Sequence, residues 1–238
     1  MILVIDAGNS RIKWGLWEDR GFVAQGAVLT GRADDLADAL HSLARFTRAV
    51  GSNVAGTAVQ MQIERVLAAW GVRPQWIRSQ ARQCGVINGY ADPAQLGPDR
   101  WAALVGAHVR FDEACLVVNV GTAVTIDALS AEGQFLGGLI LPGIELMASA
   151  LSTGTAGLPR EQGCFEEFPK STANAIHSGT LHGICGAIER MERALASTGQ
   201  VRIVMSGGGA EVVAERLGRP LTVATDLVLS GLVAIAGT

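Results

Sequence analysis

Two short polar segments of this 238-residue chain carry residue types suited to phosphate chemistry, and the first of them is DAGNS. It follows the apolar run ILVI, so Asp6 stands at the carboxyl end of a predicted strand, and Asn9 and Ser10 come directly after a glycine. A carboxylate at that place can hold a hydrated Mg²⁺ that bridges nucleotide phosphates, and amide and hydroxyl groups can donate to phosphate oxygens. Lys13, on the next predicted strand, could reach a phosphate as a point charge. The segment equally suits an ordinary β-hairpin, because Asp, Gly and Asn are good turn formers.

The second segment is LGPDRWAAL, in which Pro98 and the following apolar periodicity predict the start of a helix. Asp99 and Arg100 then lie in its first turn. There Asp99 could accept the proton of a primary alcohol as it attacks the γ-phosphorus of ATP, and Arg100 could pair with a carboxylate or a phosphate. Alternatively, an acid in a first turn only meets the helix dipole, and an Arg there is often a plain surface residue. The residues alone leave both interpretations open.

The first segment has a looser copy later in the chain. LVIDAGNSRIKWGL, residues 3–16, aligns without gaps with LVVNVGTAVTIDAL, residues 116–129, and Asp6 then faces Asn119. The identities are Leu3/Leu116, Val4/Val117, Gly8/Gly121 and Leu16/Leu129. Such a repeat predicts two similar halves, residues 1–112 and 113–238, each long enough to bury a core of its own.

The elements that must position these residues follow the same order in both halves, a strand meander and then alternating helices and strands. In the first half we expect strands at 2–6, 11–17, 22–29, 48–51 and 75–78 and helices at 33–46, 57–70 and 98–110. In the second half we expect strands at 115–119, 123–129, 135–141, 201–205 and 220–223 and helices at 143–152, 172–197, 209–217 and 226–236. This order predicts two α/β lobes with a cleft between them, and the irregular segment 153–170 is a candidate mobile loop over that cleft.

The composition of the chain indicates which classes of partner it can bind and in which cellular compartment we expect it. The chain is 49% hydrophobic and 17% charged with a net charge of −3, which offers no general attraction to nucleic acid or to an anionic membrane. Its four cysteines show no CxxC spacing, so we expect no disulfide framework and no zinc site, and Cys115 should be a free, buried thiol. A start without a basic leader, and the lack of a membrane-length apolar stretch, predict a cytoplasmic protein with no membrane partner.

Five segments of the sequence, taken together and in order, resemble those of a known protein family. With IDAGNSRIKWGL, LGPDRWAAL, VGTAVTIDAL, FLGGLILPG and STANAIHSGTLHG in this order, the chain resembles the type III pantothenate kinases, within the superfamily of acetate and sugar kinases, heat-shock cognate protein and actin. The resemblance implies an α/β fold of two similar lobes of the actin-like ATPase/ribonuclease H-like type, with a nucleotide cleft between them. It also implies ATP-dependent phosphorylation of pantothenate to 4′-phosphopantothenate, the first step of coenzyme A biosynthesis, with Mg²⁺ as cofactor.

The resemblance further implies roles for single residues. It makes Asp99 the catalytic base and Asp6 the residue that holds Mg²⁺ with ATP. The implied ATP-binding residues are Asp6, Ala7, Gly8, Asn9, Ser10, Arg11, Ile12, Lys13 and Thr122. The implied pantothenate-binding residues are Tyr90, Gly97, Pro98, Asp99, Arg100 and Thr172.

Two of these substrate residues also have simpler interpretations. In the family the threonine at the position of Thr172 reaches the pantothenate of the partner subunit, which implies a homodimer. From the residues alone, Thr172 could equally be a helix N-cap, and Tyr90, the only tyrosine of the chain, could merely pack before its Pro-containing loop.

The second copy of the repeat departs from the family pattern at Asn119, where the family usually has an Asp associated with a bound monovalent cation, K⁺ or NH₄⁺. An amide oxygen can still coordinate such a cation, but it lacks the formal charge that strengthens the site. We therefore expect a weaker cation dependence or none. SGGGA, residues 206–210, could approach the sugar or α-phosphate of the nucleotide or be a plain turn.

Two other functions compete with this one. Some relatives with this fold have carried the label of transcription accessory factors, and Asn119 could mark a catalytically weakened, regulatory member. Against that, Asp6, Asp99 and Arg100 are intact, and the sequence has no basic face or helix-turn-helix pattern for DNA. A kinase acting on a sugar or on acetate would share the fold, and only the joint presence of the GPDR and Thr172 segments favours pantothenate.

Overall fold

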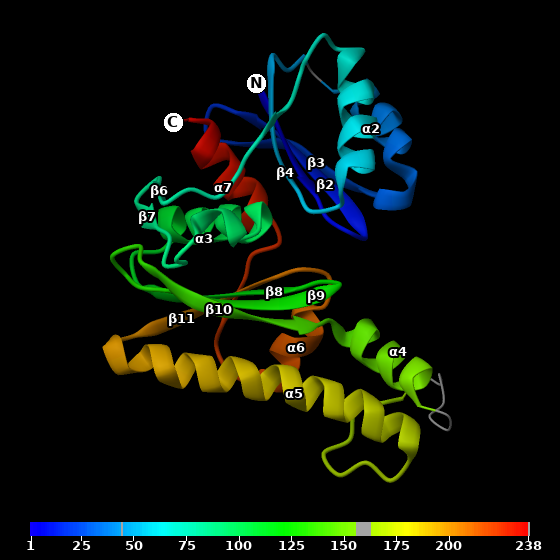
Figure 1. Ribbon diagram of the computed structural model, residues 1–238, viewed down its shortest axis with the longest axis vertical. Coiled ribbons are helices and arrows are strands. Elements are labelled where there is room, and N and C mark those ends of the chain that lie inside the picture. Colours follow the sequence, from blue (N-terminus) through cyan, green and yellow to red (C-terminus); the bar gives the residue numbers. More distant parts are fainter. Residues whose placement is uncertain (44, 156–162, 238) are drawn as a thin grey trace. The chain divides into compact units, whose positions relative to one another are not determined.

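The computed structural model describes residues 1–43, 45–155 and 163–237, and the chain divides into two compact units (Figure 1). Unit 1 comprises Met1–Asp112, Glu132–Phe135 and Asp226–Thr238, and unit 2 comprises Glu113–Ala131 and Leu136–Thr225. The sequence prediction had assigned everything after residue 112 to the second half. A repeat read along the chain cannot show that two later segments return to pack with the first unit.

Unit 1 is built on a five-stranded sheet of order β3-β2-β1-β4-β5. Its strands are β1 (Ile2–Ala7), β2 (Arg11–Glu18), β3 (Gly21–Leu29), β4 (Arg48–Asn53) and β5 (Gln75–Trp76). Its helices are η1 (Thr30–Asp35), α1 (Leu36–His41), α2 (Thr57–Ala68), η2 (Pro93–Gln95), α3 (Pro98–Arg110) and α7 (Leu227–Ala236), and a small hairpin is formed by β6 (Arg82–Gln83) and β7 (Val86–Ile87). The β1–β2 and β2–β3 pairs are antiparallel, whereas β4 runs parallel to β1.

The alternation of side chains along β1 divides this sheet into two covered faces. Leu3, Ile5 and Ala7 point to one face, where they join the buried core side chains of α1 and α2. The other face meets α7, whose Leu229 lies beside Gly15 of β2. Because Asp6 alternates with Ile5 and Ala7, its carboxylate belongs to the α7 face.

Unit 2 repeats this topology with a sheet of order β10-β9-β8-β11-β12, which confirms the repeated order of elements. Its strands are β8 (Ala114–Val120), β9 (Ala123–Leu129), β10 (Phe135–Pro142), β11 (Val201–Ser206) and β12 (Thr222–Val223). Its helices are α4 (Ile144–Gly154), α5 (Thr172–Leu195), η3 (Ala196–Thr198) and α6 (Ala210–Leu217). Figure 1 shows α5 and α6 along one face of this sheet, where Leu116, Val118 and Val120 are buried, so Asn119 points to the opposite face.

The two hairpins of the repeat are not of equal length. In unit 1, Leu3 pairs with Leu16, but Leu116, the counterpart of Leu3, pairs with Ala128. The match of Leu16 with Leu129 is therefore wrong by one residue, because the turn between β8 and β9 is one residue shorter than the turn between β1 and β2. One consequence concerns charge, since Asp6 faces Lys13 whereas Asn119 faces Thr125.

Several predicted elements differ in extent from those observed. The expected helix 33–46 ends at His41, and the chain then turns so that Phe46 stacks on Trp70 in the core before β4 begins. The strands expected at 75–78 and 220–223 are two residues long, and the hairpin of β6 and β7 was not predicted. Of the expected loop 153–170, residues 153 and 154 end α4, and 156–162 lie outside the described residues.

Helices α3 and α7 pack against each other through glycines (Figure 1). A Cβ on Gly231 would overlap the carbonyl oxygen of Ala102 and stand 2.6 Å from its carbonyl carbon and 3.0 Å from the nitrogen of Gly106. A Cβ on Gly106 would likewise overlap the carbonyl oxygen of Leu227. The absence of side chains at both positions therefore sets how closely the two helices approach.

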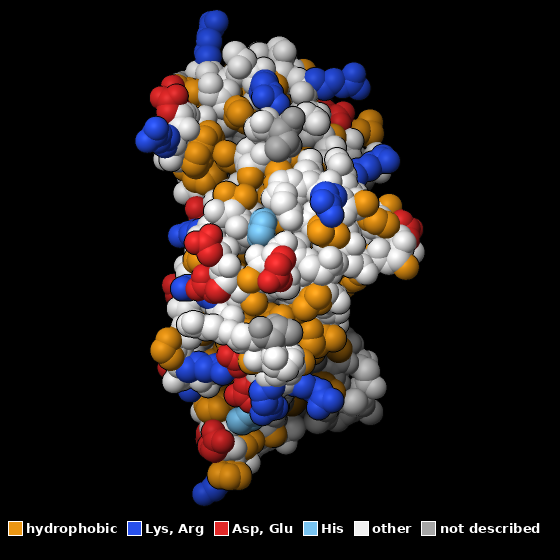
Figure 2. Space-filling view, turned by 90° about the vertical axis from the view of Figure 1, so that its left-hand side faces the viewer, with side chains coloured by type: hydrophobic (Ala, Val, Ile, Leu, Met, Phe, Trp, Pro, Cys, Tyr) orange, Lys and Arg blue, Asp and Glu red, His pale blue; other side chains and the backbone are white. Residues whose placement is uncertain are grey.

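The observed state of the cysteines agrees with the prediction made from the sequence. None of the four cysteines, all of which lie in the described ranges, forms a disulfide. Cys115 is fully buried, and burial raises the pKa of its thiol to about 12, so the prediction of a free, buried thiol there is confirmed. None of the helices in the described part of the chain is both long and apolar enough to cross a membrane. On the face drawn in Figure 2, basic and acidic side chains are interspersed with apolar ones.

Candidate functional site

Asp6 stands at the centre of three adjacent strands. It pairs with Lys13 on β2 and with Ser52 on β4, and such cross-strand neighbours share one face of a sheet. The Ser52 hydroxyl is fully buried and donates a 2.8 Å hydrogen bond to Oδ1 of Asp6. This bond fixes one oxygen of the carboxylate, so Ser52 supports a residue that sequence reasoning selected, although sequence reasoning missed Ser52 itself.

The electrostatic environment of Asp6 disfavours its charge. Burial raises its pKa to about 6, against the lowering effects of the Ser52 hydrogen bond and the Lys13 ammonium. The negative charge of Asp99 also raises the pKa of Asp6, so the two carboxylates of unit 1 interact with each other.

The turn after Asp6 is held by its own backbone and by Thr30. The Gly8 N–H donates to the Arg11 carbonyl at 3.1 Å, and a Cβ on Gly8 would crowd that same oxygen at 3.2 Å. The Thr30 hydroxyl donates to the Gly8 carbonyl at 2.7 Å, and the Thr30 N–H donates to the Ser10 carbonyl at 3.1 Å. With the turn tied down in this way, Asn9 and Ser10 are exposed at its tip.

Asp99 lies in the first turn of helix α3 as predicted, because Gly97 is the N-cap and Pro98 is the first helical residue. Its Oδ1 accepts the Arg100 N–H at 2.9 Å, so the carboxylate folds back on the helix start. A Cβ on Gly97 would stand 2.7 Å from that Oδ1, and the glycine therefore leaves room for this orientation. Burial raises the pKa of Asp99, while the backbone N–H groups and the Arg100 guanidinium lower it.

Arg100, Tyr90 and Phe135 form a cluster next to Asp99. Arg100 is only 6% exposed, and its Nη1 donates to the Tyr90 hydroxyl at 3.2 Å. Its Cζ lies 5.9 Å from the centroid of the Tyr90 ring and 6.0 Å from that of Phe135, within the range of cation–π contacts. The two rings are 5.3 Å apart, so the buried guanidinium is surrounded by aromatic faces. Sequence analysis placed Phe135 only in an expected strand and a family segment, and its place beside Tyr90 was missed because 45 positions separate the two residues.

The residues predicted from the second copy of the repeat lie in unit 2. Thr122 is exposed at the β8–β9 turn, and its carbonyl accepts the Gly143 N–H at 2.8 Å. Asn119 stands next to the glycine loop 206–210, because a Cβ on Gly207 would lie 2.7 Å from Oδ1 of Asn119. Gly207 has φ +95°, a backbone conformation that favours glycine, so this loop follows Asn119 closely.

Thr172 is the first residue of helix α5 and is exposed. The cap of that helix is Ser171, whose hydroxyl accepts the Asn174 N–H at 3.2 Å. The interpretation of Thr172 as an N-cap is therefore wrong. Asn174 also accepts the Cys164 N–H and donates to Glu166, which ties the segment before the helix to its first turn.

Within unit 1 the fold thus places Asp6, Lys13 and Ser52 on one sheet face and joins Asp99, Arg100 and Tyr90 at the start of α3. Nothing in the described ranges groups three or more His, Cys, Asp or Glu side chains as a metal cage. The donor set nevertheless fits Mg²⁺, which is commonly held by one or two carboxylates together with substrate phosphates. A divalent cation near Asp6 would also favour its charged form, against the burial and the Asp99 charge that raise its pKa.

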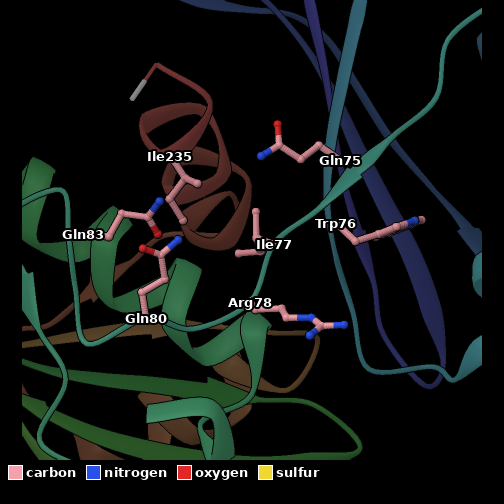
Figure 3. Close-up of a pocket in the computed structure, with 7 residues that line it drawn as sticks. All are labelled: Gln75, Trp76, Ile77, Arg78, Gln80, Gln83 and Ile235. Carbon is pink, nitrogen blue, oxygen red and sulfur yellow. The ribbon is translucent and has the colours of Figure 1, made fainter.

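A separate cavity of about 240 Å³ in unit 1 contains none of these residues (Figure 3). It is lined by Gln75, Trp76, Ile77, Arg78, Gln80, Gln83 and Ile235. In Figure 3 the side chains of Gln80 and Gln83 lie close together, whereas Trp76 and Arg78 point elsewhere. Two of its members have structural contacts, since Gln83 accepts from Trp101 and Trp76 donates to Glu64.

Comparison with known proteins decides the family. The model of the type III pantothenate kinase family matches residues 2–194. The chain belongs to the type III pantothenate kinase family. A type III pantothenate kinase of Aromatoleum aromaticum is 47% identical over 236 residues, covering 99% of this chain and 98% of the relative. One of Nitrosospira multiformis is 46% identical and covers 99% and 91%, respectively.

Solved structures confirm the fold of this type III pantothenate kinase. A Campylobacter jejuni protein assigned to the Baf family of transcriptional activators superposes with a TM-score of 0.62 at 21% identity, covering 99% of this chain and 97% of that one. A Sinorhizobium meliloti protein assigned as a 2-dehydro-3-deoxygalactonokinase gives 0.57 at 16% identity, covering 99% and 98%. At sequence identities this low, the structural similarity shows the fold alone, which is that of the actin-like ATPases and sugar kinases.

Proposed function

We propose that this protein phosphorylates the primary hydroxyl of pantothenate with ATP to give 4′-phosphopantothenate, the first step of coenzyme A biosynthesis. The observation that carries the proposal is the start of α3, where Asp99, Arg100 and the Arg100–Tyr90 hydrogen bond stand together in a chain of this family. Asp99 supplies a carboxylate, and the Arg100 cluster supplies a buried positive charge suited to a carboxylate-bearing acceptor such as pantothenate.

In the proposed mechanism the segment of Asp99 acts on the acceptor hydroxyl, and the segment of Asp6 binds the phosphates of ATP. Asp99 takes the proton of the acceptor hydroxyl as that oxygen bonds to the γ-phosphorus, while the bond from the γ-phosphorus to the β,γ-bridging oxygen breaks and ADP leaves. Burial raises the pKa of Asp99, which makes its carboxylate a stronger base than an exposed Asp. Lys13, Asn9 and Ser10 bind phosphate oxygens at the β1–β2 turn, and the hydroxyl of Thr122 stays a predicted ATP-binding group. Bound Mg²⁺, held by Asp6, would neutralise charge on the phosphates. The remaining residues of Asp6–Lys13 shape the turn.

An ADP-release assay with purified protein, MgATP and pantothenate tests this proposal. We expect turnover that depends on pantothenate, with little release when acetate or a hexose replaces it. Release that is equal with a sugar and with pantothenate would transfer the proposal to another acceptor. No acceptor-dependent release with any cation present would contradict the kinase function itself. The regulatory alternative gains no support, because the Baf-family structure is similar in fold alone.

We further propose that the monovalent-cation site of the family is weak in this chain. Asn119 lies between Thr125 and Ser206 in the sheet, so its immediate strand neighbours supply hydroxyl groups and no formal negative charge. In sodium-free buffer we expect addition of K⁺ or NH₄⁺ to change the turnover less than about twofold, because an amide oxygen binds K⁺ without charge attraction. Asn119→Asp should create a clear activation by K⁺. Strong activation of the unmodified protein would contradict the proposal.

We also propose that the protein is a homodimer in which Thr172 reaches the pantothenate of the partner subunit. Support comes from apolar side chains left exposed on the edge strand β10 and on α4, which has no buried residue. These side chains are Leu136, Leu139, Ile140, Leu146 and Leu151. A monomer rarely exposes so much apolar surface in one stretch of chain.

Light scattering should therefore give twice the 24.8 kDa mass of the chain. Ile140→Glu, at a side chain that is 65% exposed, should lower the mass toward that of one chain and reduce pantothenate turnover together with it. Val23→Glu, at an exposed apolar position on β3, is the matched control and should leave both unchanged. A monomeric protein with full activity would contradict this arrangement.

A further inference from the structure

We propose that Phe135 is a positioning residue of the acceptor site. Its ring packs against the Tyr90 ring and faces the Arg100 guanidinium, and it thereby holds both groups in place. The inference rests on the proposed function insofar as it concerns pantothenate. Phe135 is fully buried, and it is separated in sequence from both residues that its ring meets. It would act through Tyr90 and Arg100 and not by touching the reacting atoms.

The first step of the argument is how Phe135 reaches this place. Glu132–Phe135 belong to unit 1 although they precede the main part of β10. The Ile87 N–H donates to the Gly133 carbonyl at 2.9 Å, and Gln134 forms a parallel bridge with Ile87. This single bridge joins the segment to the small two-stranded hairpin of β6 and β7, which directly precedes Tyr90.

The second step is the tight fit of the Phe135 backbone against the chain before Tyr90. A Cβ on Gly89 would overlap the Phe135 carbonyl oxygen and stand 3.2 Å from its carbonyl carbon. The Tyr90 N–H is held by Oδ1 of Asn88 at 3.0 Å, and Asn88 is itself buried and donates to the Pro93 carbonyl. The backbone around Tyr90 is therefore fixed, and the ring of Tyr90 takes its position from the ring of Phe135.

The third step concerns Arg100. Its guanidinium has the Tyr90 hydroxyl as a hydrogen-bond partner, and both aromatic rings face it at about equal distance. A desolvated cation over an aromatic face is attracted by the ring quadrupole, and an aliphatic side chain of similar size offers no such attraction. Replacing Phe135 by Leu would keep an apolar filling but remove one of the two faces that orient Arg100.

Kinetics with a matched control test the consequence for the substrate. Phe135→Leu should raise the KM for pantothenate about tenfold and leave the KM for ATP within about twofold. Phe46→Leu is the control, because Phe46 is a buried aromatic of the same unit that stacks on Trp70 and belongs to the core cluster of α1 and α2, which contains no residue of α3. It should lose comparable thermal stability and change neither KM. Equal rises of both KM values in Phe135→Leu would overturn the proposal.

A measurement without substrate separates this inference from the proposed function. Tyr90 is the only tyrosine, so protein grown with 3-fluorotyrosine gives a single ¹⁹F resonance. That resonance should move or broaden in Phe135→Leu and stay in place in Phe46→Leu. An unchanged resonance in Phe135→Leu would overturn the positioning role even if pantothenate turnover is found. If the unmodified protein has no pantothenate turnover, the proposed function fails, and the resonance still decides whether Phe135 holds Tyr90.

Discussion

Asp99→Asn should lower kcat for pantothenate phosphorylation on the order of 10³-fold, because the variant keeps the shape of the side chain but removes the base. The Arg100 N–H that now donates to Oδ1 of Asp99 can donate to the amide oxygen, so the start of α3 should be preserved. The KM for ATP should change little. Steady-state ADP release, with the KM for each substrate determined separately, measures this effect.

The same variant should be more stable than the unmodified protein at pH 8. Burial raises the pKa of Asp99, so its charged form costs free energy in the folded state wherever the carboxyl is ionised. This cost is present above the folded-state pKa and disappears below the unfolded value of about 4. The gain in Tm from Asp99→Asn should therefore be largest at pH 8 and vanish at pH 4, as thermal melts at the two pH values would measure.

Gly97→Ala provides a second test of the same carboxylate. A methyl group there would stand 2.7 Å from Oδ1 of Asp99, and the flexible end of that side chain can move aside with little loss of stability. We expect kcat to fall at least tenfold while Tm is nearly unchanged, because displacing a catalytic group by a fraction of an ångström to 1 Å has large kinetic effects. Full activity in both variants would show that Asp99 is not the base.

Gly231→Ala should destabilise unit 1 by about 3 kcal/mol or more, because the new methyl group would overlap backbone atoms of Ala102 and Gly106. Backbone within a helix cannot turn aside as a side chain can, so α3 and α7 must separate. For a chain of this size such a loss lowers Tm on the order of 10 °C, which a thermal melt measures. Asp99 and Arg100 lie at the start of α3, and activity should therefore fall even below the melting temperature.

Gly186→Ala in α5 is the matched control for that change. Gly186 is also a glycine inside a helix, but a Cβ there meets nothing within 4 Å. Alanine is the better helix former by about 1 kcal/mol, so this variant should be as stable as the unmodified protein or more stable. If Gly231→Ala melted at the same temperature as Gly186→Ala, the close contact of α3 and α7 would be contradicted.

The sequence by itself determined the pieces of the fold that are local. The helix from Pro98 to Arg110 was predicted to the residue, because a proline at its first position and an apolar periodicity are signals carried by the helix itself. The strand meanders around Asp6 and Asn119 were found through their turn residues and through the repeat. The family also followed from short motifs in a fixed order, and the comparisons confirm it.

Only the tertiary structure decided which distant residues stand beside these motifs. Ser52 reaches Asp6 through the parallel pairing of β4 with β1, and Phe135 reaches Tyr90 because four residues of a later hairpin return to unit 1. The apolar helix α7 likewise joins unit 1, since Gly231 and Gly106 let it lie against α3. Pairing between distant strands and the packing of one helix on another depend on the shape of both surfaces, and a pattern read along one segment contains only its own half of that information.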